Sequence, residues 1–321
     1  MNDVTFLDFV QDGIEQVEDR IRERTYNYHA SIQAALDHLL ASGGKRIRAA
    51  ITLLTGNMLN AEPEQLISLA ASIESLHTAT LVHDDLIDGA LIRRGSPTLN
   101  AQWAPAATVL TGDFIFAQAA VLAAETNSVS VMQLFARTLA TIVNGEITQF
   151  FSSRVVVSRE NYYQRIYAKT ASLFETATQS AALISPVGDE TVKLCAQFGY
   201  KIGMAFQIVD DILDFTGEQA TIGKPVASDL RMGLITLPAI YYAEMYPADR
   251  DMVAIQNGNH SSEVNYERLV NSIRESGAIG QSIDEAKKLV FDGLTCLEKL
   301  PDVPERQALR ELAEFIVRRN N

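Results

Sequence analysis

Apolar residues recur along most of this chain with the spacing of an α-helix. Between residues 64 and 88 the stripe consists of Leu66, Leu69, Ala70, Ile73, Leu76, Thr80 and Leu81. Residues 162–184 and 196–215 show similar apolar spacing. Because such a stripe turns one face of a helix towards a core, each segment is predicted to be helical. Alternating strand patterns are nearly absent, and the best of them, Arg154–Ser158, is short.

Clusters of glycine, serine and proline separate the helical segments. They lie at Ser42-Gly43-Gly44, Gly95-Ser96-Pro97, Ser185–Gly188 and Thr221–Pro225. These residue types favour turns and helix ends. The polar segment Tyr246–Asn265 is predicted to be a surface connection. No break resembles a linker between domains, so we predict one all-α domain over residues 1–321, with ten or more helices.

Charge and composition narrow the class of partner. The 321 residues carry a formal net charge of −13, and 47% of them are hydrophobic. Nucleic acid is disfavoured as a partner because phosphate backbones need a basic surface. An acidic protein still binds anions where cations cluster or metals bridge the charges. Cys195 and Cys296 have no metal-binding spacing, so we expect reduced thiols, which points to the cytoplasm.

The longest apolar stretch, Ala106–Ala124, raises the question of a membrane span. Asp113 lies in the middle of this stretch. A charge at the centre of a bilayer is costly, so a buried core helix is preferred and no integral membrane segment is expected. The first residues, MNDVTFLDFV, are acidic, unlike the basic start of a signal peptide.

Two acidic motifs carry the predicted chemistry. The motif DDLID begins at Asp84, and the motif DDILD begins at Asp210, after an apolar run. The six carboxylates belong to Asp84, Asp85, Asp88, Asp210, Asp211 and Asp214. On a helix, the first and last aspartates of each motif share a face, and hard cations offset their mutual repulsion. One such motif is as often a solvated helix end, but two favour Mg²⁺ ions around a diphosphate.

Basic residues accompany the first acidic motif. Arg93 and Arg94 follow it closely, and the segment GGKRIR, residues 43–48, opens an earlier helix. Backbone N–H groups at a helix start also attract anions. The spacing is not that of a Walker motif. Alone, each basic group suits a solvated surface, but together with the acidic motifs they indicate a second, metal-free diphosphate pocket.

Six segments in the same order carry a family resemblance. They read GGKRIRA, LVHDDLIDGALIRRGSPT, GDFIFAQA, YAKTASLFE, GMAFQIVDDILDFTG and GKPVASDL. The chain resembles the trans-prenyl diphosphate synthases over roughly residues 40–240, and their long-chain, octaprenyl- and solanesyl-type branch more than the farnesyl branch. This implies an isoprenoid-synthase bundle around a central cavity. It also implies a prenyltransferase that condenses isopentenyl diphosphate head-to-tail onto geranyl, farnesyl or geranylgeranyl diphosphate.

The resemblance also implies residue roles and a cytoplasmic homodimer. The six aspartates would bind Mg²⁺, three ions per active site, with Asp214 the weakest ligand. Contacts to the allylic diphosphate would come from Arg93, Lys169 and Lys224. Contacts to isopentenyl diphosphate would come from Lys45, Arg48, His77 and Arg94. Thr170 and Gln207 would face the reacting carbons.

Helical spacing supports part of this assignment. His77 shares a helix face with Asp84 and Asp88, and Gln207 lies one turn before Asp210 and Asp211. On its own, His77 suits a core histidine. Lys169 can equally be interpreted as a residue of an apolar helix whose ammonium group reaches out to water.

Small residues near the first motif bear on product length. Ala79 and Thr80 lie one turn before Asp84, where relatives with short products have large aromatic side chains. The motif also lacks a two-residue insertion, and a motif with that insertion would resemble the bacterial farnesyl synthases. A deeper pocket and products beyond twenty carbons are therefore expected. Phe150 and Phe151 are candidates for the floor of this pocket. Alternatively, the two residues are small only to let helices pack closely.

Two positions depart from the family pattern, and three alternative functions remain to be considered. Ala227 stands where the family often has glycine, and Leu234 where it often has lysine, which removes a cation near the allylic site. The alternatives are a short-chain farnesyl or geranylgeranyl diphosphate synthase, a terpene cyclase and a non-catalytic subunit of a heteromeric synthase. A cyclase would have no use for GGKRIR, and its second motif would have a hydroxyl residue in place of Asp214. Non-catalytic subunits usually lose aspartates that this chain keeps.

Overall fold

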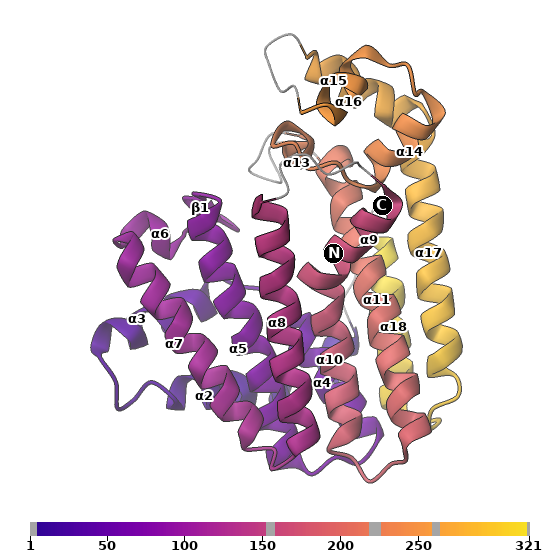
Figure 1. The fold of residues 1–321 in the computed structure, drawn as a ribbon. Coiled ribbons are helices and arrows are strands. Elements are labelled where there is room, and N and C mark those ends of the chain that lie inside the picture. Colours follow the sequence, from indigo (N-terminus) through magenta and orange to yellow (C-terminus); the bar gives the residue numbers. More distant parts are fainter. Residues whose placement is uncertain (1–4, 152–157, 218–225, 259–263, 320–321) are drawn as a thin grey trace. The chain divides into compact units, whose positions relative to one another are not determined.

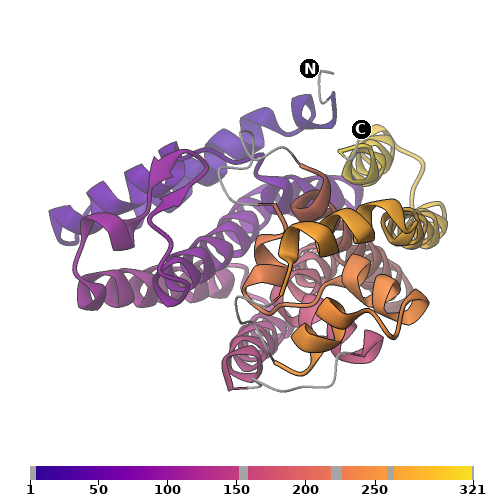
Figure 2. The same cartoon turned by 90° about the horizontal axis from the view of Figure 1, so that it is seen from above.

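The structure, a computed structural model, describes residues 5–151, 158–217, 226–258 and 264–319. Most of these residues form helices (Figure 1), and the view from above shows the same predominance of coiled ribbon (Figure 2). Within the described ranges the sheet is a single hairpin, in which β1 (Ile92–Arg93) pairs antiparallel with β2 (Ser96–Pro97). The all-α prediction is confirmed.

Contacts between Cα atoms divide the chain into two compact units. Unit 1 comprises Met1–Thr138, Leu173–Gly199 and Cys296–Leu312, and unit 2 comprises Leu139–Ser172, Tyr200–Thr295 and Ala313–Asn321. The expectation that residues 1–321 form one synthase domain concerns independent folding and stays a prediction.

The helices fall into three groups by unit. Unit 1 contains α1 (Thr5–Asp8), α2 (Gln11–Glu23), α3 (Ala30–Ala41), α4 (Ile47–Met58), α5 (Pro63–Ile87), α6 (Leu99–Gln102) and α7 (Pro105–Ala124). Unit 2 contains α9 (Arg159–Ile166), the π-helical turn η1 (Tyr167–Ala171), α13 (Ser228–Arg231), α14 (Leu237–Met245), α15 (Arg250–Gln256) and α16 (Tyr266–Glu275). Both units receive residues from α8 (Val129–Phe151), α10 (Ser172–Leu183), α11 (Asp189–Thr216), α17 (Ala278–Leu297) and α18 (Pro304–Arg318).

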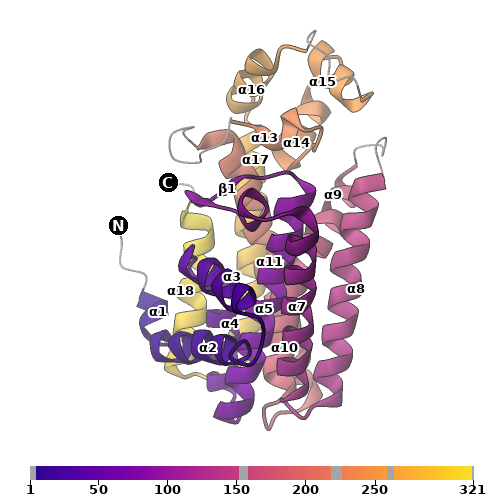
Figure 3. The same cartoon turned by 90° about the vertical axis from the view of Figure 1, so that its left-hand side faces the viewer.

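Helix α5, which carries the first acidic motif, is buried on almost all sides. Pro63 occupies its first turn, and the Glu62 side chain caps it by accepting a hydrogen bond from the backbone N–H of Gln65. Besides the predicted apolar stripe, polar residues such as Ser72 and Glu74 are also buried. Each has a partner: the Ser72 hydroxyl donates to a carbonyl oxygen of α7 at 2.7 Å, and Glu74 pairs with an arginine. Figures 1 and 3 show α5 and α7 running side by side.

Helix α7 contains the apolar stretch predicted to be a core helix. It is the one helix in the described parts of the chain that is long and apolar enough to cross a membrane, with a mean hydropathy of 1.6. Core helices of water-soluble proteins also reach this length and hydropathy. One side of α7 packs on α5, whereas Leu110, Val109 and Val121 are exposed, and 39% of its apolar window is buried. The expectation of a core helix rather than a membrane span stays a prediction. The Asp113 side chain is 59% exposed and lies 3.5 Å from His83.

Three local features differ from the sequence predictions. The predicted helix 162–184 contains the π-helical turn η1, and the predicted surface connection Tyr246–Asn265 contains helix α15. Asp249 caps α15, and Met252 and Ile255 are buried, which explains why this short polar segment is helical. The hairpin β1–β2 arises because Arg94 and Gly95 both have positive φ, 51° and 79°. Of the short strand-like pattern Arg154–Ser158, only Ser158 lies within the described residues.

The two cysteines are free thiols, as predicted. Cys195 is buried, and burial raises the pKa of its thiol, which keeps it protonated. Cys296 is half-buried, with Sγ 3.5 Å from Oε1 of Gln197.

Candidate active site

The first acidic motif lies at the C-terminal end of α5, next to the hairpin (Figure 1). Asp84 is half-buried, Asp85 is buried and Asp88 is the exposed C-cap residue. Nε of Arg93, on β1, donates to Oδ1 of Asp85 at 2.8 Å. The carbonyl groups at a helix C-terminus add negative potential to these carboxylates. The end of α5 is therefore a region that attracts cations.

Basic residues gather around His77, two turns earlier on the same helix. Nη1 of Arg48 lies 3.1 Å from Nε2 of His77. An arginine only donates hydrogen bonds, so Nε2 is the acceptor and the imidazole is neutral. Burial, and then the charges of Arg48, Arg94, Arg93 and Arg46, hold the pKa of His77 well below its usual value. Of the residues predicted to hold isopentenyl diphosphate, Arg48, His77 and Arg94 thus belong to one electropositive cluster, and Lys45 is exposed.

The glycine-rich segment before α4 is fitted closely to this cluster. Nη1 of Arg94 donates to the carbonyl oxygen of Gly43, and a β-carbon at Gly44 would collide with the same guanidinium. Arg46 is bound by Glu18 at 3.0 Å and Glu74 at 3.3 Å. Arg46 therefore holds the loop in place, whereas the neighbouring Arg48 contacts His77.

The three aspartates of the second motif, on α11, have different surroundings. Asp211 is 4% exposed, and its carboxylate accepts hydrogen bonds from Tyr162 at 2.7 Å and Gln207 at 2.8 Å. Burial raises its pKa to about 7, against the opposing effect of these hydrogen bonds. Asp214 accepts from the backbone N–H and hydroxyl groups of Ser228, at 3.1 and 2.9 Å, so it anchors the start of α13. Asp210 is more accessible than Asp211, with 38% of its side chain exposed.

Arg319, beyond the end of α18, occupies one oxygen of Asp210. Its Nη2 donates to Oδ1 at 2.9 Å. No local sequence pattern predicts this contact, since the two residues are 109 positions apart. Tyr162 was missed as well, because its spacing is that of an ordinary core residue of α9.

The donor set suits a hard divalent cation, though no complete metal site is preformed. Among the described residues, no group of three or more His, Cys, Asp or Glu side chains is arranged to hold a metal ion. Mg²⁺ usually takes one or two carboxylates and completes its octahedron with water and substrate phosphates. Asp84, Asp88 and Asp210 offer oxygen ligands of this kind. The role of all six aspartates as metal ligands stays a prediction.

The π-helical turn positions two of the predicted catalytic residues in unit 2. Nζ of Lys169 lies 2.9 Å from Oε1 of Glu146, with 38% of the lysine side chain exposed. The hydroxyl of the buried Thr170 donates to Oε1 of Gln207 at 2.6 Å. Since Gln207 in turn donates to Asp211, a chain of hydrogen bonds fixes Thr170 and Gln207 against the second motif. Lys224 lies outside the described residues.

The residues predicted to determine product length differ in how deeply they are buried. Ala79 is completely buried, and Thr80 is half-buried, with its hydroxyl donating to the carbonyl oxygen of His77 at 2.7 Å. Phe150 and Phe151 are 70% and 75% exposed at the end of α8. The prediction that these two phenylalanines close a buried cavity is therefore wrong.

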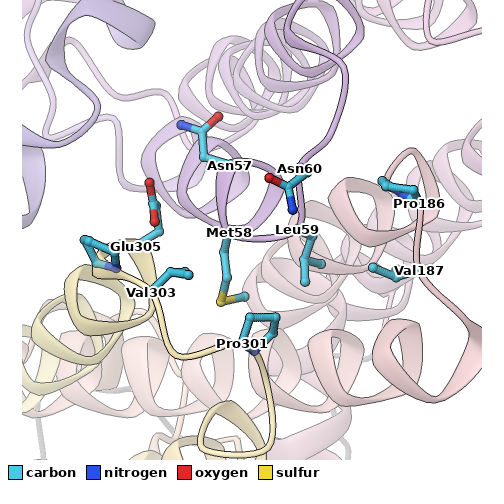
Figure 4. A pocket seen from close by; sticks show the side chains of 10 residues that line it. Asn57, Met58, Leu59, Asn60, Pro186, Val187, Pro301, Val303 and Glu305 are labelled. Atoms are coloured by element: carbon cyan, nitrogen blue, oxygen red, sulfur yellow. The ribbon is translucent and has the colours of Figure 1, made fainter.

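A cavity of about 330 Å³ in unit 1 contains none of the predicted site residues (Figure 4). It lies among the connections α4–α5, α10–α11 and α17–α18. Figure 4 shows Met58, Leu59, Pro186, Val187 and Pro301 around it, with Glu305 as its charged residue. Its lining offers no cluster of cations or carboxylates, so the predicted chemistry does not belong to this cavity.

Comparisons with known proteins agree with the predicted family. The sequence model of the polyprenyl synthetase family matches residues 29–273. Heptaprenyl diphosphate synthase component 2 of Geobacillus stearothermophilus is 34% identical over 313 residues, which cover 97% of each protein.

Solved structures agree over almost the whole chain. The polyprenyl synthase of Caulobacter crescentus CB15, complexed with calcium and isoprenyl diphosphate, has a TM-score of 0.90 and 34% identity, covering 98% of this chain and 97% of that one. The decaprenyl diphosphate synthase of Rhodobacter capsulatus has a TM-score of 0.91 and 32% identity, covering 99% of both chains. The protein therefore belongs to the polyprenyl synthetase family and is a prenyltransferase of isoprenoid synthesis.

Proposed function

We propose that this protein condenses isopentenyl diphosphate head-to-tail onto an allylic diphosphate and releases a long-chain, all-trans polyprenyl diphosphate. One observation carries the proposal: within unit 1, carboxylates at the end of α5 lie on the same helix as the electropositive cluster around His77. A cation-attracting region and a metal-free anion-binding region are what a two-diphosphate reaction needs. The short-chain synthase is the alternative, and the length of the product separates the two.

Magnesium is the proposed cofactor, with three ions per active site. Asp84, Asp88 and Asp210 are accessible enough to offer oxygen atoms to it, whereas Asp85 and Asp211 are buried. When bound, Mg²⁺ would neutralise the allylic diphosphate as a leaving group. The calcium and isoprenyl diphosphate in the Caulobacter relative support a divalent cation beside a diphosphate.

The residues of the chain would bind and orient both substrates. Arg93, Lys169 and Lys224 would hold the allylic diphosphate while its C–O bond breaks. Arg48, His77, Arg94 and Lys45 would hold isopentenyl diphosphate so that its double bond attacks the allylic cation. A new C–C bond forms, and a proton passes to the released diphosphate. The fixed side chains of Thr170 and Gln207 would flank the cation, where preorganised dipoles stabilise it and water is excluded.

A long-chain product is favoured by two observations. Ala79 and Thr80 are small, so neither residue places a bulky side chain close to the first motif. The relatives reported above include a heptaprenyl and a decaprenyl diphosphate synthase. A single Ala79→Phe substitution is expected to shorten the product to fifteen or twenty carbons, because it changes shape without changing charge.

A cytoplasmic homodimer is also proposed. The exposed apolar residues Val109, Leu110 and Val121 of α7 support it, because burial of such side chains favours self-association. Light scattering of the purified protein would give a mass near 35.3 kDa for a monomer and twice that value for the dimer.

Turnover by the purified chain alone tests the proposed activity. Labelled isopentenyl diphosphate should enter organic-extractable product when farnesyl diphosphate and Mg²⁺ are present, and not when EDTA replaces Mg²⁺. Incorporation only after a second, different polypeptide is added would favour the non-catalytic subunit. Cyclic hydrocarbon formed from the allylic substrate alone would favour a terpene cyclase.

A further inference from the structure

A cavity of about 440 Å³ in unit 2 contains a single charged residue among the described residues that line it. The cavity lies between α8, α9 and the connection from α13 to α14. Hydroxyl and amide side chains form much of its lining, and the charged residue is Arg165. In a chain with a net charge of −13, a cavity wall with a cation and no carboxylate is unusual.

Arg165 is held in this wall by neutral groups. Its Nη2 donates to the carbonyl oxygen of Ile235 at 2.7 Å, and its guanidinium carbon lies 5.6 Å from the centre of the Tyr162 ring. Within the described part of the chain, no carboxylate forms an ion pair with it. The side chain is half-buried, so its charge is only partly screened by water.

Arg165 is connected to the second acidic motif through Tyr162. The Tyr162 ring lies under the guanidinium, and its hydroxyl donates to Oδ2 of Asp211 at 2.7 Å. A single side chain therefore separates the guanidinium of Arg165 from the carboxylate of Asp211.

Leu234 lines the same cavity and directly precedes Ile235, whose carbonyl oxygen accepts the hydrogen bond from Arg165. Position 234 is where the resembled family often has a lysine, so this chain lacks a cation there. The guanidinium of Arg165 reaches this connection from α9, so the neighbourhood of position 234 still holds one positive charge.

We infer that Arg165 is a positioning residue for the allylic diphosphate, and that it supplies from α9 the positive charge that position 234 lacks. The inference rests on the proposed function. The competing explanation is purely structural, with Arg165 only tying α9 to the α13–α14 connection. A structural role depends on the hydrogen bond to Ile235, whereas the inferred role depends on the charge.

Moving the charge separates these explanations. Arg165→Gln retains a donor without the charge, and it is expected to raise the KM for farnesyl diphosphate roughly tenfold, as for loss of one charge-assisted contact. The KM for isopentenyl diphosphate should not change. Adding Leu234→Lys to that variant should restore most of the lost affinity, because the cation returns from the other side of the cavity.

Arg159→Gln is the matched control, since Arg159 lies on the same helix but pairs with Glu244 outside this cavity. It should leave both KM values unchanged. An unchanged KM for farnesyl diphosphate in Arg165→Gln, or no rescue by Leu234→Lys, overturns the inference. Should Arg165→Gln not fold, Leu234→Lys alone is expected to lower that KM, and an unchanged or higher value overturns the inference. Wild-type protein without turnover contradicts the proposed function instead.

Discussion

The guanidinium of Arg319 lies against the carboxylate of Asp210, with Nη2 donating to Oδ1 at 2.9 Å. The same guanidinium stacks over the Phe206 ring, 4.3 Å from its centre. Only 17% of the Arg319 side chain is exposed, compared with 38% for Asp210. The residue after α18 thus offsets the charge of a partly exposed carboxylate of the second motif.

Removal of Arg319 should make the substrate-free protein bind divalent cations more tightly. A guanidinium and a metal ion compete for the same oxygen, so we expect Arg319→Ala to lower the Kd for Mn²⁺ by roughly threefold to tenfold. Isothermal titration calorimetry without substrate measures this. Arg318→Ala is the matched control, because Arg318 is exposed and pairs with Glu314. Equal affinities in all three proteins would show that Arg319 does not compete with the metal.

Loss of a metal-facing carboxylate should abolish most of the activity. Asp84→Ala and Asp210→Ala are each expected to reduce turnover on the order of a hundredfold or more, since charge stabilisation of the leaving group is lost. Asp113→Ala, an exposed aspartate of α7, should retain activity. Steady-state assays with and without EDTA provide the comparison. Near-normal turnover in EDTA would show that the reaction does not require a divalent cation.

The two diphosphate pockets should respond separately to mutation. Lys45→Ala and Arg48→Ala are expected to raise the KM for isopentenyl diphosphate more than that for the allylic primer, because Arg48 belongs to the cluster around His77. Arg93→Ala should impair the allylic side more, since Arg93 pairs with Asp85 of the first motif. If all three variants weakened only one substrate, this division of the basic residues would be wrong.

Glycine at position 227 should stabilise the protein. Ala227 is buried in a left-handed conformation, with φ 53° and ψ 47°, which costs a residue with a β-carbon about 1–2 kcal/mol. Glycine avoids this cost but gains entropy in the unfolded chain, so Ala227→Gly is expected to raise the free energy of unfolding by about 0.5–1 kcal/mol.

Urea denaturation measures this change, with Ala49→Gly as control. Ala49 is equally buried but lies within α4, where glycine should destabilise by about 1 kcal/mol. A loss of stability in Ala227→Gly of the same size as in the control would show that the backbone there is not strained.

Local periodicity explains what the sequence could predict. Helix α5 was predicted at 64–88 and is observed at Pro63–Ile87, because its apolar stripe and its proline start are both local signals. The contact between Gln207 and Asp211 follows from their spacing of one helical turn. Both acidic motifs lie on helices for the same reason.

Contacts between distant segments could not be predicted in this way. The pairing of Arg319 with Asp210, and the bond from Tyr162 to Asp211, join residues 109 and 49 positions apart. These contacts decide which aspartates are accessible, so six carboxylates with equal spacing have unequal surroundings. The π-helical turn at Lys169 has no periodic signal of its own, since it interrupts an otherwise continuous helical pattern.

The length of the product tests the central claim most directly. Purified protein would be incubated with farnesyl diphosphate, Mg²⁺ and an excess of isopentenyl diphosphate, and the dephosphorylated products would be separated by chromatography. We expect products of about thirty to fifty carbons from the wild type and shorter ones from Ala79→Phe at similar turnover. A wild-type reaction that stops at farnesyl or geranylgeranyl diphosphate would contradict the long-chain assignment and identify a short-chain synthase.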